Sequence, residues 1–451
     1  MIYSICKLYS KIRRLFFYWL FTFIITIFTN LQLAFAKIEI TIDEGIFEPF
    51  PIAIAEFEGN NIDSIEFGAK LREVIANDLD KSGIFRVIDN EAFLEMPSNN
   101  KVPIFANWRT INANMLLTAN IDLDREKGQI SVEYKLWDTF REKEVEKGTY
   151  KIVSDGWRRI SHKIANSIYK KFLGVEGYFD SRIVFISETG DEKNRTKRLA
   201  IMDQDGANFR ILTSGKELVL SPRFDPKSQR IVYMSYKHKN KPPKVYVLDL
   251  ETGKQTLVCD MPYMSFAPRF APDNHYVIIS LARRGTTSIY EIDIITGMET
   301  RLTKLFGVID TSPSYSPDGK KIVFNSDRGG GKTQIYIMDR DGMNISRISA
   351  GEGNYRTPVW SPNGEWIAFT KILSGNFYMG IMKPDGSDER LLTNSWLEEA
   401  PSWSPNSRTI IFGRQRRDGR SQLYAIDVNG DNERLIYSPT DASQPSWSSH
   451  L

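Results

Sequence analysis

Several short motifs in this sequence have residue types that could bind phosphate, calcium or a catalytic metal. Gly329 to Thr333 reads GGGKT, but the first glycine of a phosphate-binding loop would fall at Ser326, and the run joins two predicted strands instead of opening a helix. Asp203–Gly206 and Asp339–Gly342 resemble the start of calcium loops, yet neither has the downstream carboxylate of a twelve-residue site.

The remaining chemistry-bearing residues also argue against an active site. The four histidines show no metal-ligand spacing, and no G-x-S-x-G nucleophile motif occurs. Cys259 lies in an apolar run and is interpreted as a small buried hydrophobic residue. We therefore predict no catalytic, cofactor-binding or metal-binding residues.

The first 36 residues have the pattern of an export signal. Four basic residues precede an uncharged run from Leu15 to Phe28, and Ala34–Ala36 supplies a small-x-small cleavage site. We predict a signal peptide at residues 1–36. The alternative is an uncleaved membrane anchor, because Leu15 to Ala36 contains no charge.

Removal of this segment changes the charge and the cysteine content. The formal net charge of +3 falls to −1, since the mature chain would hold 55 basic and 56 acidic residues. Such a balance gives no global electrostatic case for binding nucleic acid or a membrane surface. Cys6 is lost with the signal, so Cys259 has no partner for an internal disulfide.

An internal repeat occupies the C-terminal two thirds of the chain. Its copies read SPRFDP, APRFAP, SPSYSP, TPVWSP and APSWSP, and the chain ends with a shortened copy, PSWSS. The first shared prolines are Pro222, Pro268, Pro313, Pro358, Pro401 and Pro445. Each motif with the three strand-like runs that follow it makes four short strands in 43 to 46 residues, the size of one β-propeller blade.

The strand count predicts how the ring closes. The three-strand part first occurs at Arg182 to Ser187, before any motif, and the last motif has no three-strand part after it. Both deficits disappear if Pro445, Trp447 and Ser448 form the inner strand beside Arg182 to Ser187, which also removes two costly strand edges. We predict a six-bladed β-propeller over residues 179–451, closed by its own C-terminal strand.

Residues 37–178 have a different rhythm and are predicted to form a small α/β domain. Ile38, Ile40 and Ile42 alternate with polar residues, as in a half-exposed strand. Asp63 and Glu66 are predicted to cap a helix, and three strands are expected within Met115 to Val153. Apolar residues from Trp157 to Phe172 form one face of a second helix that stops near Gly174.

Together these features resemble the TolB family. An α/β domain that starts with the strand KIEITIDEG, followed by P-x-[WYF]-S-P-[DN]-G repeats and a terminal PSWS, is similar to TolB proteins over essentially the whole mature chain. The resemblance implies a monomeric periplasmic adaptor of the Tol-Pal system, without cofactor, that supports outer-membrane integrity and envelope invagination at division.

The resemblance also implies two partners. TolA would bind the mature N-terminus, here Lys37, Ile38, Glu39, Ile40, Thr41, Ile42 and Asp43. Pal, an outer-membrane lipoprotein that also binds peptidoglycan, would bind at the channel mouth and hold the chain peripherally at that membrane. The Pal-facing rim would include Met264, Ala267 and Thr311, although a histidine is familiar at the position of Met264.

Two readings of the residues themselves accompany this resemblance. The loops between the second and third strands carry a formal charge of +12 and the opposite turns −11, so the propeller is expected to be basic around the channel mouth, although solvated loops without a partner would look similar. The N-terminal strand suits β-augmentation of a partner sheet, but a strand docked on its own domain is an equal alternative.

Two other functional classes stay open at this stage. An exported propeller enzyme could place carboxylates in the channel, and a binding propeller could hold a small ligand or ion there. A prolyl-oligopeptidase relative would need a hydrolase domain with a nucleophile elbow, for which residues 37–178 are too few.

Overall fold

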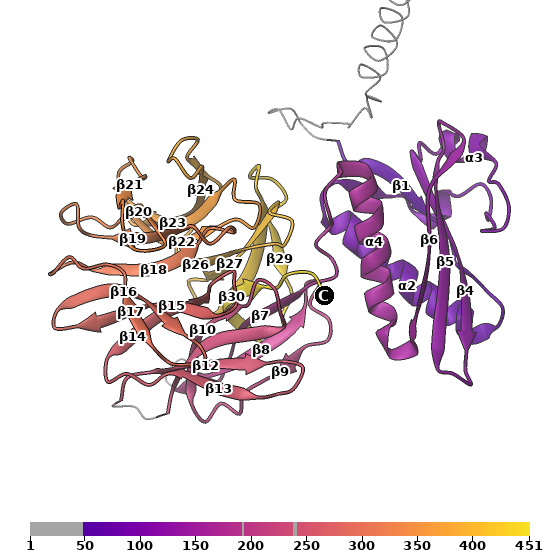
Figure 1. Ribbon diagram of the computed structural model, residues 1–451. Coiled ribbons are helices and arrows are strands. Elements are labelled where there is room, and N and C mark those ends of the chain that lie inside the picture. Colours follow the sequence, from indigo (N-terminus) through magenta and orange to yellow (C-terminus); the bar gives the residue numbers. More distant parts are fainter. Residues whose placement is uncertain (1–47, 192–193, 238–240) are drawn as a thin grey trace, which may run out of the picture. The chain divides into compact units, whose positions relative to one another are not determined.

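The computed structural model describes residues 48–191, 194–237 and 241–451, and all of these belong to one compact unit. An α/β region comes first in the chain and a ring of β-sheets follows (Figure 1). The predicted signal peptide and the strand from Lys37 to Asp43 lie outside the described residues. Within the described residues, no helix is long and apolar enough to span a membrane.

The α/β region contains a mixed sheet with strand order β3-β1-β4-β5-β6, and β2 pairs with β4. β1 runs parallel to β3 and β4, whereas β4, β5 and β6 are antiparallel. The strands are β1 (Phe50–Ile54), β2 (Glu58–Gly59), β3 (Phe85–Val87), β4 (Met115–Asp124), β5 (Gln129–Asp138) and β6 (Lys143–Val153). The helices are α2 (Ile62–Lys81), α3 (Phe105–Thr110) and α4 (Trp157–Leu173), with single 3₁₀ turns at Asn90–Ala92 and Ser154–Gly156.

The two long helices bury the apolar faces that the sequence predicts. Leu71, Ile75 and Leu79 of α2 and Ile160 and Ile164 of α4 all belong to one buried core. The predicted cap of the first helix is wrong: the side chain of Asn61, not Asp63, accepts the hydrogen bond from the Ser64 backbone N–H at 2.9 Å. α4 ends as expected at Gly174, whose φ of +69° suits a residue without a Cβ.

The rest of the chain forms six four-stranded antiparallel sheets, which confirms the predicted six-bladed propeller. Five of these sheets each consist of four strands that follow one another in the chain. They are, in chain order, β10 (Leu218–Phe224), β11 (Arg230–Tyr236), β12 (Lys244–Asp249) and β13 (Gln255–Cys259); β14 (Met264–Phe270), β15 (Tyr276–Arg283), β16 (Thr286–Asp293) and β17 (Glu299–Arg301); β18 (Asp310–Tyr315), β19 (Lys321–Ser326), β20 (Gln334–Asp339) and β21 (Ser346–Arg347); β22 (Asn354–Trp360), β23 (Ile367–Leu373), β24 (Asn376–Met382) and β25 (Arg390–Leu391); β26 (Glu398–Trp403), β27 (Thr409–Gln415), β28 (Ser421–Asp427) and β29 (Arg434–Ile436).

The sixth sheet joins the two ends of the propeller, as predicted. Its order is β30-β7-β8-β9, made of β30 (Asp441–Trp447), β7 (Arg182–Thr189), β8 (Thr196–Asp203) and β9 (Arg210–Ile211). The pairing runs from Asp441 opposite Glu188 to Trp447 opposite Ile183, so the closing strand begins four residues before the predicted Pro445. The Ser448 backbone N–H then donates to the Arg182 carbonyl at 2.8 Å.

Neighbouring inner strands are also held together by motif serines. The backbone N–H of Trp447 donates to Ser402 Oγ at 2.9 Å, and that of Phe224 donates to Ser446 Oγ at 3.0 Å. The indole ring of Trp447 is buried, and its N–H donates to Ser181 Oγ at 2.8 Å. The terminal motif therefore lies in the ring as its five siblings do.

Candidate partner-binding face

The inner strands of the propeller all begin on one face, which we call the mouth face. The first residue of each inner strand pairs with the last part of the second strand, as Leu218 does with Tyr236 and Met264 with Ala282. The loops from the second to the third strand therefore share this face with the segments that lead into the inner strands. This is the face on which the sequence predicts a partner.

A left-handed residue precedes the motif proline in every inner strand. Its φ lies between 46° and 59° in all six blades, and the strand register shifts at that point, which marks a β-bulge. The six residues are Ser221, Ala267, Ser312, Thr357, Ala400 and Gln444. None is glycine, so each stores about 1–3 kcal/mol of backbone strain, and repeated strain of this kind is typical of binding sites.

The three predicted Pal-facing residues lie on the inner strands near the mouth face. Met264 is the first residue of β14 and is 39% exposed, and Ala267 is the left-handed residue of the same strand. Thr311, on the neighbouring inner strand β18, accepts a hydrogen bond from the Asn325 side chain at 2.7 Å and lines a cavity of about 340 Å³. The structure thus places all three on adjacent blades.

Exposed apolar side chains near this rim were not predicted from the sequence. Phe306 is 78% exposed in the segment leading into β18, and Trp396 is 61% exposed in the segment leading into β26. Leu218, Leu305 and Ile309 are also exposed at such positions. Apolar residues in connecting segments were the available signal, and exposed aromatic side chains are enriched at protein interfaces.

Phe306 and Trp396 lie on segments whose backbones make hydrogen bonds to the neighbouring third strands. The Gly307 N–H, next to Phe306, donates to Thr286 Oγ1 at 2.9 Å. The residue before Trp396, Ser395, exchanges two backbone hydrogen bonds with Phe377, at 2.8 and 2.9 Å. Because the backbones of these segments are already hydrogen-bonded, docking on them costs less backbone conformational entropy.

Many basic side chains of this face are already paired with carboxylates. Arg328 binds Asp310 through two hydrogen bonds of 2.9 and 2.8 Å, and Arg414 binds Glu433 through two of 2.7 and 2.9 Å. Further pairs are Arg195 and Lys197 with Glu188, Lys244 with Asp260, and Lys371 with Glu389. These contacts neutralise part of the charge that the loop count alone assigned to the mouth face.

One carboxylate at the mouth has no such partner in the described residues. Glu399, on inner strand β26, lines two cavities of about 240 and 340 Å³. The residue is exposed, but partial desolvation raises the pKa of its carboxyl, and the charge of Arg356 works in the opposite direction. The mouth face therefore combines polar groups at the channel with exposed apolar side chains on the connecting segments.

The motifs with enzyme-like residues have structural roles in the described chain. The GGGKT run lies in the connection from β19 to β20, and Asp339–Gly342 forms the turn that follows β20. The thiol of Cys259 is buried, and burial raises its pKa to about 11. Neither the glycine-rich run nor the cysteine has the setting of a reactive group.

The structure brings together one acidic cluster that sequence spacing missed. Atoms of His162, Asp203 and Asp205 lie within 4.8 Å of one another. Burial would lower the pKa of His162, but the nearby carboxylates, Asp78 first among them, raise it to about 9. A protonated imidazole repels cations, and Nδ1 already contacts Asp78 at 2.6 Å, so the cluster is an ion-pair network.

Comparisons with known proteins agree with this architecture. The family model described as TolB amino-terminal domain matches residues 38–145, and the one described as TolB beta propeller domain matches residues 169–451. The Tol-Pal system protein TolB of Rickettsia massiliae (strain Mtu5) is 45% identical over 432 residues, which cover 93% of this chain and 96% of that protein.

Two further relatives extend the comparison to another genus and to a solved structure. The Tol-Pal system protein TolB of Gluconobacter oxydans (strain 621H) is 40% identical over 416 residues, covering 91% of this chain and 88% of that protein. The crystal structure of TolB from Acinetobacter baumannii superposes with a TM-score of 0.79 at 25% identity, covering 89% of this chain and 96% of that one.

Proposed function

Since this chain belongs to the TolB family of Tol-Pal system proteins, we propose that it is a non-catalytic periplasmic adaptor that joins Pal to TolA. Pal binds the mouth face of the propeller, and TolA binds the strand from Lys37 to Asp43. Through these contacts the protein associates peripherally with the outer membrane, and it supports envelope integrity and invagination at division.

One observation carries the assignment of the Pal surface. The exposed aromatic side chains Phe306 and Trp396 belong to segments on the same face as Met264 and Thr311, where the family resemblance puts Pal. Exposed aromatic side chains on hydrogen-bonded segments support this assignment, because aromatic residues are enriched among the residues that dominate protein binding.

The two proposed binding segments lie far apart in the sequence, so removal of one can test both parts of the proposal. Purified chain with and without residues 37–46 is used as bait on detergent-solubilised envelopes, and Pal and TolA are detected with antibodies. We expect both baits to retain Pal and only the longer bait to retain TolA. Recovery of Pal with neither bait would contradict the proposal and favour an exported propeller enzyme.

A further inference from the structure

The third position of the repeat motif differs between the first two copies and the rest. Serine or valine occupies it in four inner strands, at Ser314, Val359, Ser402 and Ser446. Three of these serines accept a backbone hydrogen bond from the next inner strand, and so hold neighbouring blades together. The first two copies carry Arg223 and Arg269 instead, and an arginine side chain cannot accept the backbone hydrogen bond that these serines accept.

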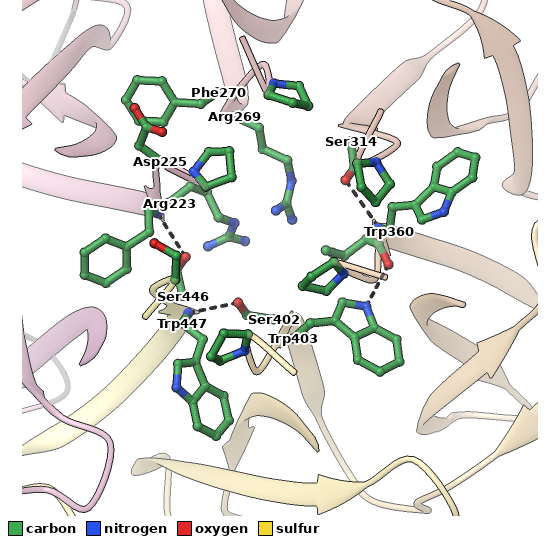
Figure 2. A pocket seen from close by; sticks show the side chains of 18 of the residues that line it. Arg223, Asp225, Arg269, Phe270, Ser314, Trp360, Ser402, Trp403, Ser446 and Trp447 are labelled. Carbon is green, nitrogen blue, oxygen red and sulfur yellow. Dashed lines mark hydrogen bonds between the residues drawn. The ribbon is translucent and has the colours of Figure 1, made fainter. Parts of the chain in front are cut away.

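Both arginines point into one cavity at the end of the inner strands, away from the residues that begin them (Figure 2). The cavity has a volume of about 380 Å³, and motif residues of the inner strands line it. Tryptophan and phenylalanine side chains of the motifs stand around it, and Arg223 and Arg269 come from adjacent strands, β10 and β14.

Neither guanidinium has a counter-charge among the described residues. Arg223 is buried and donates to the Pro222 carbonyl at 2.7 Å and to the Pro445 carbonyl at 3.5 Å, whereas the guanidinium of Arg269 makes no hydrogen bond to any described residue. No carboxylate of the described residues lies within 4.0 Å of either guanidinium group. The carboxylate that does line the cavity, Asp225, is engaged by Arg230 at 2.6 Å.

The electrostatics of the cavity are therefore one-sided. Burial lowers the pKa of Arg223 to about 10, and burial together with the charge of Arg223 lowers the pKa of Arg269. Lys227 adds a third cationic side chain to the lining. Like charges that line one cavity repel each other, and a bound anion would relieve both the repulsion and the lost hydration.

We propose that this cavity is a binding site for a phosphate group, held between the guanidinium groups of Arg223 and Arg269. The two cations match the charge of a phosphate dianion, and the planar N–H fork of arginine suits its oxygen atoms. The cavity exceeds the size of the ion, so the phosphate arrives either as free inorganic phosphate or as part of a small phosphomonoester. The site lies apart from the mouth face.

The test titrates the full chain with sodium phosphate against sodium chloride at constant ionic strength, using isothermal titration calorimetry and ³¹P line broadening. A parallel titration with glycerol 3-phosphate distinguishes the two sources of phosphate. Tighter binding of the ester assigns the site to a phosphomonoester, and equal affinity assigns it to the free ion. We expect saturable binding with one site per chain.

Variants locate the site within the propeller. Arg269→Gln should weaken phosphate binding at least tenfold, and Arg269→Lys, which keeps the charge but not the planar fork, should weaken it less. Arg417→Gln removes the same charge from an exposed position and should bind as the wild type does. Absence of saturable binding in the wild-type chain, or an Arg269→Gln variant that binds phosphate as tightly as the wild type, would overturn the proposal.

Discussion

Replacement of Trp447 by alanine should destabilise the propeller as strongly as the same change in the middle of the chain. Only four residues follow Trp447 in this sequence, a position where a side chain would ordinarily contribute little. Its sibling Trp403 occupies the same motif position in β26, and the two side chains are 5% and 4% exposed. Trp403→Ala is therefore a matched control.

The expected magnitude follows from what each indole contacts. A buried tryptophan removes about 150–250 Å² from water, an upper bound of about 4–6 kcal/mol. Each indole also donates one hydrogen bond, from Trp447 to Ser181 Oγ at 2.8 Å and from Trp403 to the Val359 carbonyl at 3.0 Å. Large-to-small substitutions of this kind cost about 3–5 kcal/mol of unfolding free energy, and we expect that loss for both variants.

Urea denaturation, followed by tryptophan fluorescence and far-ultraviolet circular dichroism, measures both losses on the same scale. Equal destabilisation supports closure of the ring by β30. If Trp447→Ala stays within about 1 kcal/mol of the wild type while Trp403→Ala loses about 3–5 kcal/mol, the terminal strand adds little to the fold and the closure argument is refuted.

Two further predictions concern strain and protonation. Ala400→Gly should leave the free energy of unfolding unchanged or raise it by up to about 1 kcal/mol, because φ at Ala400 is +59°. The control Ala425→Gly, in the regular strand β28, should lower it by about 0.5–1 kcal/mol. Urea midpoints distinguish the two variants, and equal losses would argue against backbone strain at Ala400. The stability advantage of wild type over His162→Gln should be full just below pH 6.5 and fade as the pH rises through about 9, because the folded-state pKa of His162 is raised. It should also fall at acid pH, because burial raises the pKa of Asp78 and protonation of that carboxylate breaks the same ion pair. A pH-independent difference would contradict this ion pair.

The blades and their closure could be predicted because the same sequence pattern occurs in every copy of the repeat. Six prolines at a regular spacing located the inner strands, and counting strands around them left one arrangement for Trp447. In the α/β region, the spacing of Leu71, Ile75 and Leu79 indicated a helix face that the structure buries. The local sequence pattern was sufficient to predict an element wherever its conformation and its buried face depend on its own residues.

The features that sequence reasoning missed depend on atoms brought together by the fold. The left-handed residues before the motif prolines, such as Thr357, gave no warning because neither glycine nor asparagine occupies them, and residues before proline normally favour extended conformations. The contact of His162 with Asp78 joins positions 84 apart in sequence. The cavity arginines did leave a signal, since Arg223 and Arg269 break the repeat at its third position.

The most direct test of the proposed function is the affinity of the mouth face for Pal. Isothermal titration calorimetry with the soluble domain of Pal compares the wild-type chain with Phe306→Asp and Thr311→Arg. The control is Phe140→Asp, which changes a phenylalanine that is 61% exposed in the connection from β5 to β6 of the α/β region.

We predict that Phe306→Asp and Thr311→Arg each weaken Pal binding at least tenfold, about 1.4 kcal/mol or more, while Phe140→Asp binds as the wild type does. Unchanged affinity in both mouth-face variants, with Pal still bound, would contradict the assignment of this face as the Pal-binding surface.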